Sequence, residues 1–286
     1  MAGVVRTARA KVNLWLNVVG RRADGYHLLD SLVAFADLAD MVEASPADHL
    51  SLGFDGSAPG AAALAAEPDN LVLKAARLLA ERAGVKPHAA LRLAKHIPVA
   101  AGLGGGSADA AAALAALVDL WRIQLADRDL FDLAARLGAD VPMCLAGHPS
   151  FVSGVGELLE AAPALPPCAI LLVNPSVALS TADVFSARRD GFSPERPRAR
   201  TWSSLKDFAD VLAERGNDLT TAAVSLQPVI GEVLSLLRAT DGARYAAMSG
   251  SGATCFALYE TDAEARQAAA RLPAAWWRHA GRLDPG

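Results

Sequence analysis

A glycine-rich stretch that runs directly into an alanine-rich helix constrains this chain more than any other feature. From Pro98 to Asp109 the sequence reads Pro-Val-Ala-Ala-Gly-Leu-Gly-Gly-Gly-Ser-Ala-Asp, and apolar residues then recur at helical spacing as far as Trp121. Glycines let backbone N–H groups approach a ligand, and the positive end of the helix points to the same place. Ser107 is expected to cap the helix. The stretch predicts a phosphate-binding loop, with a simple turn before a helix as the alternative.

The common sequence signatures of other phosphate sites and catalytic centres do not fit. A dinucleotide-binding fingerprint needs a glycine where Ser107 stands, and a Walker A loop needs Gly-Lys-Ser or Gly-Lys-Thr. The sequence has neither the His-Arg-Asp and Asp-Phe-Gly triplets of protein kinases nor a Gly-x-Ser-x-Gly hydrolase elbow. No histidine or cysteine pair has the spacing of a zinc site. The loop is therefore of another type.

Strands and helices are expected to follow one another irregularly. Between Thr7 and Val19 apolar residues alternate with a polar row that holds Lys11, Asn13 and Asn17, the period of a half-buried strand. The other expected elements are a returning strand at 26–33, helices at 71–82, 107–121 and 127–137, strands at 89–93 and 169–174, helices at 203–215 and 228–240, a hairpin within 245–259 and a helix at 262–272. This order predicts an α+β fold. The length of 286 residues favours two domains, placed at 1–153 and 154–286.

Net charge, cysteine content and the apolar segments indicate the class of partner and the cellular compartment. The formal net charge of −4 gives no general attraction to nucleic acid or to an anionic membrane. The three cysteines are scattered in apolar surroundings, which favours reduced core thiols. Basic residues occupy the N-terminal stretch where a signal peptide would be apolar, and the most apolar long segment, 110–121, is too short to span a bilayer. A cytoplasmic protein is expected.

The glycine-rich loop resembles a known family motif. Residues 98–111 are similar to the central motif of the galactokinase, homoserine kinase, mevalonate kinase and phosphomevalonate kinase superfamily, and Gly250-Ser251-Gly252 is similar to its third motif. The resemblance implies a two-domain small-molecule kinase fold with its active site in the cleft between domains, and ATP with Mg²⁺ as cofactor. The nucleotide contacts that it implies are Asn70, Lys95, Pro98, Gly102, Leu103, Gly104, Gly105, Gly106, Ser107 and Ala108. Helix capping is the alternative role for Asn70.

Three further stretches narrow the resemblance. Ala10-Lys-Val-Asn-Leu, Asp24-Gly-Tyr-His and Leu137-Gly-Ala-Asp-Val-Pro are similar to the 4-diphosphocytidyl-2-C-methyl-D-erythritol kinase family, and Asn217-Asp218 follows in that family's order. This implies transfer of the ATP γ-phosphoryl group to the 2-hydroxyl of that cytidine diphosphate methylerythritol, in the non-mevalonate route to isoprenoids. Ser107-Ala-Asp109 departs from the Ser-Ser-Asn or Ser-Ser-Asp of several relatives. A carboxylate at Asp109 would repel a bare phosphate.

Lys11 and Asp140 are the expected catalytic pair, and they correspond to the family's catalytic residues. Phosphoryl transfer depends mostly on positioning and charge compensation. An aspartate can accept or orient the proton of the acceptor hydroxyl, and a lysine can offset charge on the transferring group. As alternatives, Lys11 is a solvated charge on the strand and Asp140 a turn residue, followed by Val141 in the extended geometry favoured before Pro142. Asparagines on the same face as Lys11 weigh against a solvated role.

The substrate contacts implied by the resemblance are Asn13, Tyr26, His27, Phe185, Gly250 and Ser251. Aromatic faces stack on a nucleobase, and polar groups near His27 can read its edge. The alternative places Tyr26 and Phe185 in the hydrophobic core, His27 beside a turn, and the 250–252 glycines in a tight hairpin.

Two other functions stay open from the sequence. Another kinase of the superfamily, of homoserine or mevalonate type, would share the loop without binding cytidine. A catalytically silent regulatory relative would keep the fold and lose the reactive pair. The motif around His27 argues against the first, and retention of Lys11 and Asp140 argues against the second. A monomer or weak homodimer is expected.

Overall fold

The computed structural model describes residues 3–56, 70–198 and 201–284, and this part of the chain forms two compact units. One unit contains residues from Met1–Ala10, Leu38–Val99 and Gly104–Gly147, and the other contains residues from Lys11–Asp37, Ala100–Leu103 and His148–Gly286. The two units are therefore interleaved along the sequence. The long strands β1 (Val4–Arg21) and β2 (His27–Ser45), joined by the turn at Asp24-Gly25, contribute residues to both.

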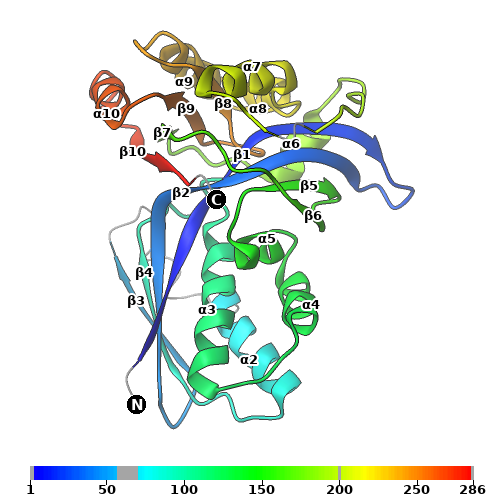
Figure 1. Ribbon diagram of the computed structural model, residues 1–286, viewed down its shortest axis with the longest axis vertical. Coiled ribbons are helices and arrows are strands. Elements are labelled where there is room, and N and C mark those ends of the chain that lie inside the picture. The colour runs from blue at the N-terminus through cyan, green and yellow to red at the C-terminus, as the bar shows by residue number, and fades with distance from the viewer. Residues whose placement is uncertain (1–2, 57–69, 199–200, 285–286) are drawn as a thin grey trace. The chain divides into compact units, whose positions relative to one another are not determined.

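The first unit packs helices on one side of a small sheet (Figure 1). Its strands are β3 (Ser51–Gly56), parallel to β4 (Ala90–Lys95), and the C-terminal part of β2, antiparallel to β4. The N-terminal part of β1 also belongs to this unit. Its helices are α2 (Leu71–Ala83), α3 (Gly105–Trp121), α4 (Asp127–Leu137) and α5 (Val141–Ala146). The alanine-rich α3 contacts the other three helices, because its small side chains permit close approach. Ten of its residues are buried, so this helix is the centre of the core.

The second unit surrounds an antiparallel sheet. Strand β7 (Cys168–Asn174) lies between β9 (Cys255–Tyr259) and β10 (Trp277–Leu283), and β8 (Tyr245–Met248) follows β9. Strand β5 (Ser150–Gly154) pairs with both β2 and β6 (Leu158–Ala161). The helices are α6 (Thr181–Ala187), α7 (Leu205–Arg215), α8 (Thr220–Leu226), α9 (Val229–Arg238) and α10 (Asp262–Ala270). All seven residues of β7 are buried, which makes it the central strand of this core.

The expected elements are confirmed, but β2 continues to Ser45 instead of ending near Val33. Three further expectations differ from the structure. Both faces of β1 are buried from Ala10 to Leu16, so the strand is not half-buried as its alternation predicted. Helix α3 begins at Gly105 with Gly104 as its N-cap, so the prediction that Ser107 caps the helix was wrong. Val141 begins α5 and is not extended, because a proline is tolerated in the first turn of a helix.

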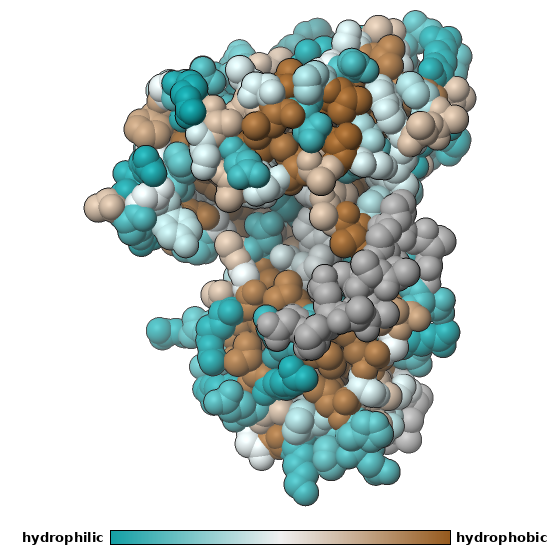
Figure 2. Space-filling model, turned by 180° about the vertical axis from the view of Figure 1, so that it is seen from behind, coloured by the Kyte–Doolittle hydropathy of each residue, from teal (hydrophilic) through white to brown (hydrophobic). Residues whose placement is uncertain are grey.

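The surface of the described residues mixes apolar and polar side chains. Figure 2 shows apolar residues on both units among hydrophilic ones. Tyr26 is the most exposed of the large hydrophobic side chains, at 63%. Among the described helices none is long and apolar enough to cross a bilayer. The three cysteines are free thiols, as expected, and burial raises the pKa of Cys168 and of Cys255 to about 12.

Candidate active site

The glycine-rich loop is held by direct backbone and side-chain contacts within the second unit. Gly102 has a left-handed φ of 76°, and a Cβ added there would lie 2.2 Å from the carbonyl oxygen of Gly252. On either side of Gly102, the Ala101 carbonyl accepts a hydrogen bond from Thr254 Oγ1 at 2.5 Å, and the Leu103 carbonyl accepts one from the Lys11 amide at 2.9 Å. The glycine-rich loop and the loop at 249–252 therefore touch backbone to backbone at Gly102, which only glycine permits.

The start of α3 suits an anionic ligand. Gly104 takes the left-handed conformation, with φ of 65°, and the helix begins immediately after it. The first turn carries no acidic side chain. The first backbone N–H groups of a helix have no intrahelical partner, and the macrodipole adds positive charge there. Ser107 is the third helical residue, so its hydroxyl lies on the first turn and does not cap it.

The ten predicted nucleotide contacts differ in exposure. Gly106 is exposed, and Gly102, Gly104, Gly105 and Ser107 are partly exposed. The buried members are Asn70, Lys95, Pro98, Leu103 and Ala108. The Asn70 side chain accepts a hydrogen bond from the Val72 amide at 2.9 Å, so it caps α2 as the alternative role predicted. Their assignment to ATP stays a prediction.

A buried charge cluster underlies the first turn of α3. Lys95, only 2% exposed, forms ion pairs with Asp40 and, at 2.7 Å, with Asp109. A Cβ on Gly105 would lie 3.3 Å from the Lys95 ammonium. Burial, reinforced by the negative charge of Asp40, raises the pKa of Asp109 to about 7 although Lys95 opposes the shift. One ammonium cannot compensate two buried carboxylates, so Asp109 holds a proton more readily than an ordinary aspartate. This cluster accommodates the carboxylate of Asp109 beneath the start of α3.

Asp109→Asn is expected to become more stable relative to the wild type as the pH rises. Because the folded-state pKa of Asp109 is raised to about 7, its contribution to stability is fully present only below its ordinary pKa of 3.8 and is lost as the pH rises through 7. An asparagine stays neutral throughout. Thermal unfolding of the variant and the wild type between about pH 5 and about pH 8 measures the difference.

Asp119→Asn is the matched control, since Asp119 lies on the same helix with an exposed side chain paired to Arg6. Its melting temperature relative to the wild type should show no comparable trend. Parallel pH curves for Asp109→Asn and the wild type would contradict the raised pKa.

Lys11 lies in a buried polar group within the second unit. Its side chain is 7% exposed, which excludes the solvated alternative, and its ammonium donates to Asn13 Oδ1 at 2.6 Å. The backbone amide of Asn13 donates to Ser249 Oγ at 3.1 Å, and a Cβ on Gly250 would lie 3.1 Å from Asn13 Oδ1. Strand β1 and the 249–252 loop therefore bring three predicted site residues together: Lys11, Asn13 and Gly250.

Asp140 belongs to the first unit. It precedes α5, with φ of −86° and ψ of −11°, and its carbonyl accepts a hydrogen bond from the Cys144 amide at 3.1 Å. Its side chain is partly exposed. Asp140 thus occupies the turn between α4 and α5, as its alternative role predicted, and its pairing with Lys11 in catalysis stays a prediction.

The aromatic residues expected to bind the base lie in the second unit. The rings of His27 and Phe185 stack with centroids 4.9 Å apart. Burial, together with Arg21 and Arg188, lowers the pKa of His27, so the imidazole is neutral at pH 7. Tyr26 is largely exposed rather than in the core. Ser251 Oγ lies 2.8 Å from Thr181 Oγ1 of α6, the helix that carries Phe185.

Several polar residues that hold these groups were not predicted. They are Asp40, Ser31, Asn174, Ser249 and Thr254, all buried. Asn174 donates to Thr254 Oγ1 at 2.9 Å, and Thr254 in turn holds the glycine-rich loop. Polar residues inside otherwise apolar strands were the available signal, since burying an unpaired polar group is costly. The described residues contain no group of three or more His, Cys, Asp or Glu side chains that could hold a metal ion.

Comparison with known proteins matches both parts of the chain to one family. The family profile for the GHMP kinases N terminal domain matches residues 70–148, and that for GHMP kinases C terminal matches residues 198–278. The chain is 54% identical to the 4-diphosphocytidyl-2-C-methyl-D-erythritol kinase of Paramagnetospirillum magneticum, over 94% of this chain and 95% of that protein. It is 51% identical to the kinase of the same name from Rhodospirillum rubrum, over 98% of this chain and 92% of that protein.

Solved structures give the same picture. A crystal structure of 4-(cytidine 5'-diphospho)-2C-methyl-D-erythritol kinase has a TM-score of 0.81 and 39% identity, with 99% of this chain and 100% of that chain covered. Homoserine kinase from Cytophaga hutchinsonii, with a TM-score of 0.69 and 18% identity over 100% of this chain and 96% of that chain, shares the fold.

Proposed function

We propose the following reaction for this chain, which belongs to the 4-diphosphocytidyl-2-C-methyl-D-erythritol kinase family of the GHMP kinases: it transfers the γ-phosphoryl group of ATP to the 2-hydroxyl of 4-diphosphocytidyl-2-C-methyl-D-erythritol. The reaction belongs to the methylerythritol phosphate route to isoprenoids. The contact of Lys11 with the glycine-rich loop carries the proposal. Its amide donates to the Leu103 carbonyl within the loop, so the lysine is fixed beside the proposed phosphate site.

Lys11 and Asp140 perform the chemistry in this proposal. The Lys11 ammonium compensates negative charge on the transferring group, which is the main requirement of phosphoryl transfer. Asp140 accepts or orients the proton of the acceptor hydroxyl. The contacts of Lys11 with Asn13 and with the loop fix its position before the substrate binds, which lowers the entropic cost of reaching the reactive geometry.

The glycine-rich loop and the first turn of α3 bind the triphosphate. The close approach of Gly102 to Gly252 leaves backbone instead of side chains at the loop surface, which fits a phosphate cradle. We propose that Mg²⁺ arrives with ATP, since this ion is commonly held by phosphate oxygens, waters and one or two carboxylates. When bound, it supplies charge neutralisation to the phosphates.

The cytidine part of the acceptor is assigned to the aromatic residues of the second unit. Exposed Tyr26 and the ring pair of His27 and Phe185 offer faces for base stacking. Neutral His27 carries one donor and one acceptor nitrogen, which suits the edge of cytosine. Asn13, Gly250 and Ser251 are assigned to the rest of the acceptor.

Three broader expectations accompany this function as proposals. The ATP-binding domain is assigned to residues 1–153 and the C-terminal domain to 154–286. The protein is placed in the cytoplasm. It acts as a monomer or weak homodimer, with no nucleic-acid or membrane partner.

A coupled ADP-release assay tests the proposed substrate. The purified chain is supplied with MgATP and, in parallel, with the cytidine diphosphate methylerythritol, homoserine and mevalonate. We expect turnover only with the first acceptor. Turnover with homoserine or mevalonate alone would replace the substrate assignment, and no turnover with any of them, with ATP still bound, would support a silent relative.

A further inference from the structure

The end of α7 and the turn that follows it contact three parts of the second unit: β1, β2 and the loop at 249–252. Residues Arg215–Asp218 run alongside β1: the Leu16 amide donates to the Gly216 carbonyl at 3.0 Å, and the Asp218 amide donates to the Leu16 carbonyl at 2.9 Å. Leu16 and Asn217 form a parallel bridge. The turn is therefore attached to the strand that carries Lys11 and Asn13. We call residues 215–218 the junction turn.

The Asn217 side chain attaches the junction turn to the glycine loop at 249–252. Its Nδ2 donates to the carbonyls of Met248 at 2.7 Å and Gly250 at 2.8 Å, while its Oδ1 accepts from the Leu219 amide at 2.9 Å. Both hydrogens of the amide NH₂ group are therefore donated to this loop and to the strand residue that precedes it. Asn217 thus fixes the peptide that carries Ser249 and Gly250.

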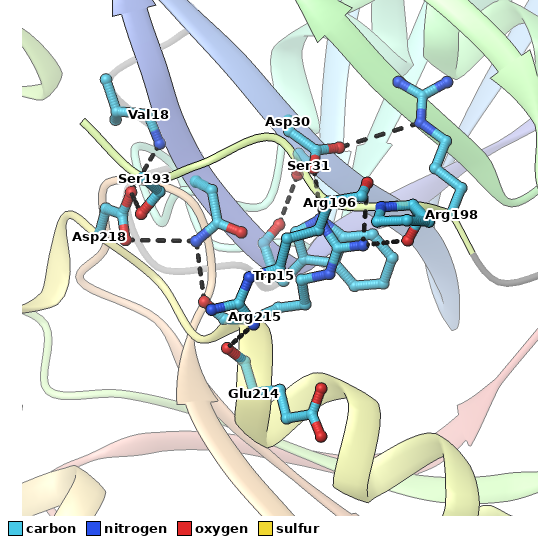
Figure 3. Close-up of polar contacts among 12 residues, drawn as sticks. Trp15, Val18, Asp30, Ser31, Ser193, Arg196, Arg198, Glu214, Arg215 and Asp218 are labelled. Atoms are coloured by element: carbon cyan, nitrogen blue, oxygen red, sulfur yellow. Dashed lines mark hydrogen bonds and ion pairs between the residues drawn. The ribbon is translucent and has the colours of Figure 1, made fainter.

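The Asp218 side chain holds β1 two residues further along the strand, at Val18 (Figure 3). One carboxylate oxygen accepts from the Val18 amide at 2.7 Å and from Ser193 Oγ at 2.8 Å, and the other accepts from Asn17 Nδ2 at 3.2 Å. The same Asn17 nitrogen donates to the Arg215 carbonyl at 2.8 Å. The strand end beyond Lys11 is therefore tied to the junction turn by side chains as well as by backbone.

Arg215 completes these contacts with a buried ion pair. Its side chain, 5% exposed, donates to Asp30 at 2.8 Å and to the Pro197 carbonyl at 2.6 Å, and its guanidinium lies 5.0 Å from the centre of the Trp15 ring (Figure 3). Ser31 Oγ, next to Asp30, donates to the Trp15 carbonyl at 2.5 Å.

A continuous path leads from this ion pair to the predicted catalytic lysine. Ser31 Oγ also accepts from Asn13 Nδ2 at 2.9 Å, and Asn13 Oδ1 accepts from the Lys11 ammonium at 2.6 Å. On the opposite side of Asn13, its backbone amide donates to Ser249 Oγ, in the loop that Asn217 holds. Both routes from the junction turn therefore end at the same pair of residues, Lys11 and Asn13.

We propose that Asn217 is a positioning residue for the kinase reaction, which sets the 249–252 loop in register with Lys11 and Asn13 through the junction turn. The proposal rests on the proposed function for its kinetic consequence, whereas the coupling of the turn to the loop rests on the contacts alone. If Asn217 only stabilised the fold, its substitution would weaken the kinetics with ATP and with the acceptor alcohol to the same extent.

Two substitutions of Asn217 separate these roles. Asn217→Asp keeps the acceptor for the Leu219 amide and removes both donors to the loop. Asn217→Ser also keeps a local acceptor, without added charge, and is too short to reach both carbonyls. Thr261→Ala is the control: it removes the capping box of α10 in the same unit, and strand β9 separates this position from the loop.

Steady-state kinetics and hydrogen exchange are measured on the full-length variants. We expect both Asn217 variants to lose roughly 10- to 100-fold in kcat/KM for the cytidine acceptor, while the KM for ATP changes by no more than about threefold. We also expect faster exchange at the Ser249 and Gly252 amides, which are bonded to Thr254 and Ser249 in the wild type. Thr261→Ala should lower the melting temperature and leave both readouts unchanged.

The outcomes distinguish the two proposals. If the wild type binds ATP but does not phosphorylate the cytidine acceptor, the proposed function is wrong. Hydrogen exchange at the 249–252 loop then still tests whether Asn217 holds this loop. Wild-type kinetics in both Asn217 variants, or unchanged loop exchange, would overturn the positioning role. Equal losses in the kinetic parameters for ATP and for the acceptor would also overturn it, if the control variant lost as much activity at the same loss of stability.

Discussion

Asp140→Asn is expected to lower turnover by on the order of 10²-fold or more, with ATP affinity close to that of the wild type. The amide keeps the shape of the carboxylate but cannot accept the proton of the acceptor hydroxyl. The glycine-rich loop and the first turn of α3 are untouched by the change, so triphosphate binding should persist. Single-turnover rates with the cytidine acceptor and equilibrium binding of an ATP analogue measure the two quantities separately.

Asp132→Asn provides the control, because Asp132 is exposed on α4, the helix that leads to Asp140. Its kinetics should match those of the wild type. If Asp140→Asn turned over as fast as Asp132→Asn, Asp140 would have no part in the reaction. A parallel loss of ATP binding would instead assign Asp140 to the nucleotide.

Gly102→Ala is expected to disrupt the active loop. Two costs add at this position: a left-handed φ of 76°, and a Cβ 2.2 Å from the Gly252 carbonyl oxygen, which is closer than atoms can approach. One of the two loops must move. Since a displacement of about 1 Å in a catalytic group can cost about 10²-fold in rate, we expect kcat/KM to fall by at least that factor.

Gly84→Ala is the control, because it introduces the same backbone strain without a clash. Gly84 ends α2 with a comparable φ of 67°, and nothing lies within 4 Å of an added Cβ. This variant should lose about 1 to 2 kcal/mol of stability, the cost of a left-handed alanine, and keep its activity. Equal activity in both variants would mean that the contact between Gly102 and Gly252 has no bearing on the reaction.

Local patterns in the sequence predicted most of the elements. The helix at 127–137 matches α4 residue for residue, because acidic residues begin it and Gly138 ends it. The strand at 169–174 lacks one residue of β7, and the hairpin within 245–259 is formed by β8 and β9. These elements depend on contacts close in sequence, which periodicity and turn residues report.

The environment of the site residues depended on partners distant in sequence. The alternation in β1 predicted one solvated face, yet Lys11 is buried because β1 lies against elements from far along the chain, including the 249–252 loop. Lys95 was expected at the nucleotide, and its two carboxylate partners, 55 and 14 residues away, could not be identified from spacing. Ser107 resembled a cap by residue type, but the preceding glycines begin the helix earlier.

The interleaving of the two units determines the order in which they can be completed during synthesis. The last segment of the first unit ends at Gly147, so this unit can close while the ribosome still holds the second half of the chain. Residues 11–37 must wait longer, since Ala36 pairs with Leu283 of the final strand. The lysine-bearing strand is thus among the first segments made and the last to be enclosed, and a nascent chain exposes it for most of translation.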